Sequence, residues 1–172
     1  MKWEIWCVVG LVVASLGCGG RVENETTGSP GWTASGTEYL LTTQPADAIA
    51  VGAARQSVVD QQEVTLVGVI GGSASPFVEG MAAFTIVDSK VPFCAPEEGC
   101  KTPWDYCCTQ NEVKDNIATV KVVDASGNPM TIDAKGLLGV KELSTVWVQG
   151  KVKRDDAGNL SIAASKVFVK NP

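Results

Sequence analysis

Short runs of β-branched and aromatic residues with period-two alternation constrain the fold of this chain most strongly. In residues 146–153, for example, Val146, Val148 and Val152 fall on one face of a strand. Five further runs, separated by turn residues, occupy residues 64–70, 82–88, 117–123, 130–133 and 160–169. Residues 137–143 are the helix-like exception. The pattern predicts a mainly β domain with five or six strands and one short helix, which favours a small barrel over a sandwich of about seven strands.

The order of these segments resembles an OB-fold. The first strand reads Val-x-Leu-x-Gly-x-Ile, the second Phe-Thr-Ile-Val-Asp, and the last two are Val-x-Val-x-Gly-x-Val and a hairpin with Gly-Asn-Leu-Ser-Ile. In OB-folds a glycine in the first strand permits the sharp coil that joins both sheets, and a short helix plugs the barrel between the third and fourth strands. The resemblance covers residues 63–169. It implies that Gly68 is this glycine and that residues 137–143 are the plug.

The first residues resemble a bacterial lipoprotein signal. The apolar run 5–16 is too short to span a bilayer of about 30 Å but has the length of a signal core. It leads to Gly17 and Cys18, as in a lipobox, although Ser15 stands where Leu is usual. The resemblance implies a signal peptide at 1–17 and an acylated Cys18 as a membrane anchor. Gly19 after the cysteine favours the periplasmic face of the outer membrane. An ordinary secretory signal and an uncleaved anchor are the alternatives.

Residues 18–60 are predicted to be a flexible tether, followed by the barrel domain at 61–172. Residues 28–36 are rich in Gly, Ser and Pro, which favours an irregular chain. Residues 46–59 are rich in alanine and have the composition of a short helix. We expect this segment to hold the domain away from the lipid surface.

An insertion at 90–113, between the second and third predicted strands, holds four of the six cysteines: Cys94, Cys100, Cys107 and Cys108. An even set in an exported chain predicts disulfides first. A bond between the adjacent Cys107 and Cys108 would be strained. The pairings that remain are Cys94–Cys107 with Cys100–Cys108, or Cys94–Cys108 with Cys100–Cys107.

A metal site is the main alternative for these cysteines. Four thiolates can surround Zn²⁺, and fewer can hold Cu(I), because soft sulfur suits both ions. The insertion lacks a Cys-x-x-Cys pair, and adjacent cysteines are less suited to binding one ion. Thiol redox chemistry at the adjacent pair is a third hypothesis.

The composition excludes several functions. The chain has no histidine, so Ser-His-Asp and Cys-His catalysis and His-containing zinc sites are excluded. A formal charge of −5 argues against nucleic acid as a partner. Asp105 is expected to cap a turn after Pro103. The side chains with the most suitable chemistry for a ligand-contact face are Trp104, Tyr106, Trp147 and Lys151.

Two classes of function remain. The first is a non-enzymatic envelope lipoprotein whose barrel displays a disulfide-stapled loop to an envelope protein or a glycan. The second is a lipoprotein that handles zinc, copper or thiol redox chemistry with the loop cysteines themselves. No residue pattern predicts an enzyme.

Overall fold

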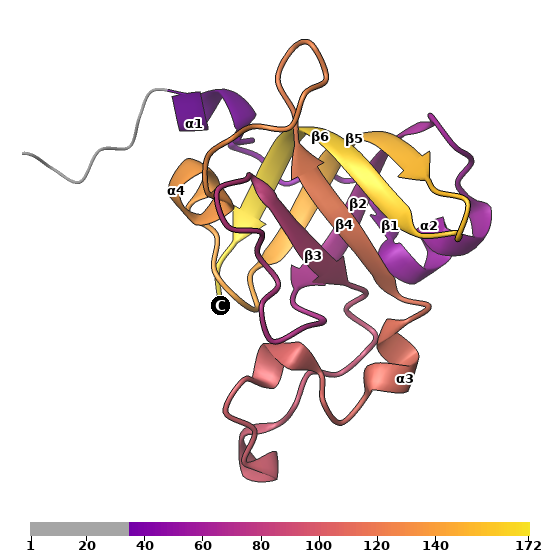
Figure 1. Cartoon of the computed structure of the whole chain (residues 1–172), viewed down its shortest axis with the longest axis vertical. Coiled ribbons are helices and arrows are strands. Elements are labelled where there is room, and N and C mark those ends of the chain that lie inside the picture. The colour runs from indigo at the N-terminus through magenta and orange to yellow at the C-terminus, as the bar shows by residue number, and fades with distance from the viewer. Residues whose placement is uncertain (1–34) are drawn as a thin grey trace, which may run out of the picture. The chain divides into compact units, whose positions relative to one another are not determined.

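The computed structural model describes residues 35–172, which form a mainly β structure (Figure 1). The six strands are β1 (Ile49–Ala50), β2 (Glu63–Ile70), β3 (Ala83–Val87), β4 (Ile117–Val122), β5 (Thr145–Arg154) and β6 (Leu160–Lys170). The α-helices are α1 (Ser35–Tyr39), α2 (Val51–Ser57), α3 (Gln110–Val113) and α4 (Ala134–Leu138), and two 3-10 turns cover Pro96–Glu98 and Pro103–Asp105. None of the helices in this part of the chain has the length and apolarity to cross a bilayer.

Five of the strands close into an OB-like barrel. Their order is β2-β3-β4-β6-β5, and β2 closes the ring by also pairing with β5. All of these neighbours are antiparallel except β4 and β6, which are parallel. The parallel pair arises because β6 inserts between β4 and β5 after the final hairpin. The predicted fold class is therefore confirmed, with β1 added parallel to β2 as an extra strand.

Gly68 lies where β2 passes from one side of the barrel to the other. Residues 63–69 of β2 pair with β5, whereas residues 69–70 pair with β3. A Cβ atom on Gly68 would lie 2.9 Å from the carbonyl oxygen of Val87 and 3.1 Å from Cγ2 of Val51. Only glycine permits such a close approach of neighbouring atoms. Gly68, which was predicted to permit the sharp coiling of the first strand, therefore also lies where a side chain would not fit.

The core consists of inward-facing residues at alternate positions of the strands, among them Leu66, Phe84, Val120, Val148 and Ile162, all fully buried. Helix α4 adds Ala134, Leu137 and Leu138 to this cluster. It occupies the predicted place in the chain, but it spans Ala134–Leu138 rather than 137–143, because Gly139 ends it with a φ of 67°. Residues 130–133 form no strand and instead lead into α4.

The prediction of a flexible tether is wrong for residues 35–60. Tyr39, Val51, Ala54 and Val58 are buried in the main core, and β1 pairs with β2. Helix α2 lies within the segment 46–59, where a short helix was expected. The alanine-rich composition resembled a linker because small residues pack against the barrel without a strong apolar period. Residues 18–34 of the predicted tether, the signal at 1–17 and Cys18 lie outside the described residues.

Candidate metal centre

The insertion forms a long loop between β3 and β4 that extends from one end of the barrel (Figure 1). A small apolar cluster, separate from the main core, anchors it: Val87, Val91, Tyr106 and Val113, with Ile117 packed against them. The cluster draws on both ends of the loop and on β3. The loop is therefore fixed to the barrel by apolar packing at its base.

Tyr106 is the central side chain of this anchor. It is fully buried, and its hydroxyl has no hydrogen-bond partner. Its ring fits against the backbone of Gly71, where a Cβ atom would lie 2.8 Å from Cε2 of Tyr106 and 2.6 Å from the carbonyl oxygen of Trp104. The N–H of Gly72 donates to the same carbonyl. Tyr106 was predicted to contact a ligand. That prediction is wrong, because the side chain is enclosed by the protein.

The loop brings the sulfur atoms of Cys94, Cys100, Cys107 and Cys108 together, and we call this group the four-cysteine cluster. All four Sγ atoms lie within 4.8 Å of one another. Cys107 lies 3.2 Å from Cys94, 3.0 Å from Cys100 and 3.7 Å from Cys108, and Cys100 lies 3.9 Å from Cys108. A disulfide requires about 2.0 Å. The four side chains are free thiols in this structure.

Backbone geometry on the second half of the loop directs the adjacent cysteines into the cluster. Tyr106 has a φ of 57°, the left-handed conformation, and thereby reverses the chain just before Cys107. Asp105 accepts hydrogen bonds from the Thr102 hydroxyl at 2.6 Å and from the N–H of Cys107 at 2.8 Å. These bonds hold the pKa of Asp105 below its ordinary value, with the Thr102 hydroxyl as the largest cause. Asp105 therefore caps the turn, as expected from the sequence.

The cluster is open to solvent on one side. Cys94 is buried, Cys100 is half-buried, and Cys107 and Cys108 are exposed. A metal ion held here would be enclosed by protein on the side of Cys94 and reachable by a competing ligand on the opposite side. Such a site differs from a zinc site that is closed within a core.

Hydrogen bonding among the thiols favours ionisation of one thiol to a thiolate and opposes further ionisation. Burial of Cys94 disfavours its ionisation, but hydrogen bonds from the backbone N–H of Cys108 and from the other thiols hold its pKa below the ordinary value. The pKa of Cys100 is raised, first by its side-chain hydrogen bond with Cys107. That of Cys108 is raised to about 12, first by its side-chain hydrogen bond with Cys94. A bound cation would compensate the repulsion between further thiolates.

The distances suit one tetrahedral ion. With Zn–S bonds of about 2.3 Å, sulfur atoms at the corners of a tetrahedron lie about 3.8 Å apart. Two of the observed separations, 3.7 Å and 3.9 Å, are near this value. Two more, at 3.0 Å and 3.2 Å, would open by less than about 1 Å, and the remaining two of the six pairs lie within 4.8 Å. Cys107 and Cys108, although adjacent in the sequence, both contribute a sulfur atom to the cluster.

The other residues predicted for a ligand-contact face are not gathered at one place. The indole of Trp104 donates to the carbonyl of Ala74, at the base of the loop. Trp147 lies on β5, edge-on to Phe168 with ring centroids 5.6 Å apart. Lys151 lies further along β5 and is exposed. The role of Gly71 and Gly72 in contacting the loop was not predicted, although a glycine pair after a strand is a signal of close backbone approach.

The fold and the cluster together describe an OB-like barrel with a four-thiol loop. No family model, curated protein or solved structure matches this chain.

Proposed function

We propose that this chain is a non-enzymatic, lipid-anchored protein of the cell envelope that binds one soft metal ion, Zn²⁺ or Cu(I), at the four-cysteine cluster. The convergence of four free sulfur atoms within 4.8 Å carries this proposal. Thiolates are the ligands that both ions accept most readily. The proposal of a lipid anchor is based on the resemblance of residues 1–18 to a lipoprotein signal.

The position of the cluster supports handling of an exchangeable ion rather than a role in folding. The loop is attached through Tyr106 and its apolar neighbours, and none of these contacts requires a metal. The main core lies in the barrel and shares no buried residue with this anchor. We therefore expect the chain to stay folded when the ion is removed.

Metal content measured with thiol titration tests the proposal. The full chain would be purified in a non-ionic detergent under reducing conditions, and zinc and copper would be quantified per chain. We expect one ion per wild-type chain, seen as added mass in the native protein. After denaturation we expect four alkylatable thiols in the processed chain, which lacks Cys7 and carries an acylated Cys18. Retention of far-ultraviolet circular dichroism after chelation would support an exchangeable ion.

A matched pair of variants in the same loop separates the metal ligand from the loop. Cys100→Ser is expected to lower metal content to less than a tenth of the wild-type value. Lys101→Ser introduces the same residue at an exposed neighbouring position and is expected to retain the metal. Equal metal content in the two variants would refute binding at the cluster.

A loop stapled by disulfides is the second candidate, and one observation favours it. The short distances of 3.2 Å from Cys94 to Cys107 and 3.0 Å from Cys100 to Cys107 each belong to one of the two pairings expected from the sequence. In an oxidising compartment these thiols could close without a large movement of the backbone. A denatured mass four hydrogens below the reduced value, with no metal, would support this candidate over the first.

A further inference from the structure

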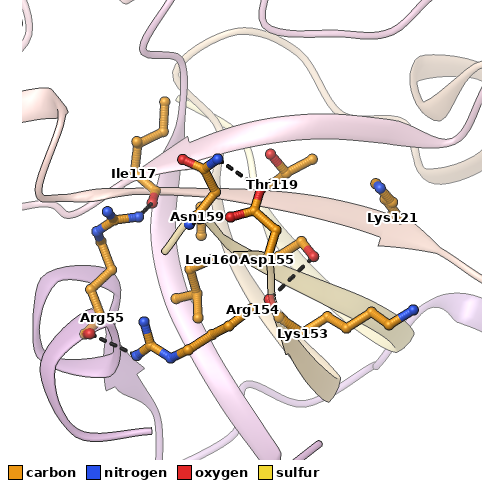
Figure 2. A pocket seen from close by; sticks show the side chains of 11 residues that line it. Arg55, Ile117, Thr119, Lys121, Lys153, Arg154, Asp155, Asn159 and Leu160 are labelled. Atoms are coloured by element: carbon orange, nitrogen blue, oxygen red, sulfur yellow. Dashed lines mark hydrogen bonds between the residues drawn. The ribbon is translucent and has the colours of Figure 1, made fainter. Parts of the chain in front are cut away.

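A second site is a basic cleft on the side of the barrel, and none of the four cysteines lines it. Its volume is about 540 Å³, and it is lined by residues of α2, β4, β5, β6 and the β5–β6 hairpin (Figure 2). Its charged lining consists of Arg55, Lys121, Lys153, Arg154 and Asp155. The formal charge of this lining is +3, although the chain as a whole carries −5. The cleft therefore concentrates positive charge on an acidic protein.

The two arginines are held in place by carbonyl groups. Arg154 donates to the carbonyl oxygens of Ala54 and Val58 at 3.1 Å each and also to that of Arg55. Arg55 donates to the carbonyl oxygen of Ile117 at 3.1 Å. These bonds fix the guanidinium groups but leave their charges without a carboxylate partner.

The carboxylates of residues 35–172 leave the cleft with a net positive charge. Asp155 uses its oxygens within the hairpin, where it accepts bonds from the N–H of Ala157 and from the backbone and side chain of Asn159. Asp60 interacts with Lys153 electrostatically but forms no ion pair with it. Across residues 35–172 the ion pair of the structure is Lys135 with Glu142, outside the cleft. An anion entering the cleft would therefore meet uncompensated charge.

Strand register gives the cleft its shape. Thr119 of β4 and Lys153 of β5 both pair with Ser161 of the middle strand β6. Lys121 of β4 pairs with Ala163 of β6 in the same way. Small residues on β6 therefore lie between residues with longer side chains on β4 and β5. Because β6 separates them, β4 and β5 are about 9–10 Å apart. Lys121 and Lys153 therefore line the cleft from the two strands that flank β6, and Figure 2 shows them on these separate strands.

We propose that this cleft binds a phosphate group, carried by a free small molecule or by a lipid headgroup. The ammonium and guanidinium groups and the hydroxyl of Thr119 supply the donors that phosphate oxygens accept, whereas the Ser161 hydroxyl donates to the carbonyl oxygen of Lys153. The lining has no aromatic side chain on which a base could stack, which disfavours single-stranded nucleic acid. The proposal does not rest on the four-cysteine cluster, because no cysteine lines the cleft.

Binding measured by NMR tests the proposal. The full chain in a non-ionic detergent would be titrated with inorganic phosphate and, separately, with glycerophosphoglycerol, the deacylated form of an anionic lipid headgroup. Saturable shifts of amide resonances in residues 117–121 and 153–161 are expected for at least one of the two probes. Tighter binding of the diester would identify a headgroup as the source, and tighter binding of inorganic phosphate a free phosphate.

Two charge-matched double variants decide the outcome. Lys121→Gln with Lys153→Gln is expected to weaken binding at least tenfold. Lys141→Gln with Lys170→Gln removes the same charge from exposed positions outside the cleft and is expected to change affinity less than twofold. Absence of saturable shifts with both probes, or equal weakening in both double variants, would overturn the proposal. An oligodeoxythymidine that bound the cleft more tightly than either probe would also contradict the proposal.

Discussion

Replacing Tyr106 with phenylalanine is expected to stabilise the protein, although the change removes a polar group. The hydroxyl is fully buried without a hydrogen-bond partner, and its burial raises the pKa of Tyr106 to about 12. A buried, unpartnered polar group costs about 1–3 kcal/mol. Phenylalanine keeps the ring against Gly71 and the same backbone conformation, so Tyr106→Phe should raise the free energy of unfolding by about 1 kcal/mol.

That gain corresponds to a rise of about 2–4 °C in Tm for a chain of this size. It would be measured by calorimetry and by urea unfolding followed through tryptophan fluorescence, with chelator and reductant present so that metal makes no contribution. The gain should be the same at pH 7 and pH 9, because the tyrosine is neutral at both values.

Tyr39→Phe is the matched control, since the Tyr39 hydroxyl donates to the sulfur of Met130 at 3.4 Å. Loss of that bond is expected to destabilise the protein by about 0.5–1 kcal/mol. If Tyr106→Phe destabilised the protein as much as Tyr39→Phe, the hydroxyl of Tyr106 would have a partner and our account of the anchor would be refuted.

Two further variants test the contact of Gly71 with the cysteine loop and the role of Asp155 in the β5–β6 hairpin. Gly71→Ala should weaken metal binding and destabilise the protein by about 1–3 kcal/mol, because its Cβ would lie 2.6 Å from the Trp104 carbonyl oxygen. Gly136→Ala has open space and should be neutral or stabilising in the same unfolding and metal assays. Asp155, whose pKa is lowered first by the Asn159 side chain, should contribute stability above about pH 4 that is lost as pH falls further. The loss of stability between pH 5 and pH 2 should be smaller in Asp155→Asn, and an unchanged acid profile would count against this role.

The barrel could be predicted because its determinants are local. Alternation along each strand and the glycine at position 68 are visible within a few residues. Residues 35–60 were misassigned because their burial depends on a distant partner: Val51 fits beside Gly68 only because β2 lacks a side chain there. An alanine-rich segment has no apolar period that would reveal such a contact.

The candidate sites were predictable to different degrees. The spacing of the cysteines indicated a cluster, but its sulfur atoms converge because Tyr106 adopts a positive φ, which is uncommon outside glycine. The basic cleft was not predicted at all. It depends on Arg154 reaching the carbonyl of Arg55, a residue 99 positions earlier that had been assigned to the tether.

The separation of the two apolar clusters bears directly on how a metal could act here. In a small zinc domain the ion replaces a core, and its removal unfolds the chain. In this protein the barrel core around Leu66 and Phe84 is complete without the loop, and Tyr106 holds the loop base without a metal. Three of the four thiols remain accessible from solvent. If the cluster binds an ion as proposed, the binding energy is not required for folding, so the affinity can be low enough for exchange while the barrel stays intact.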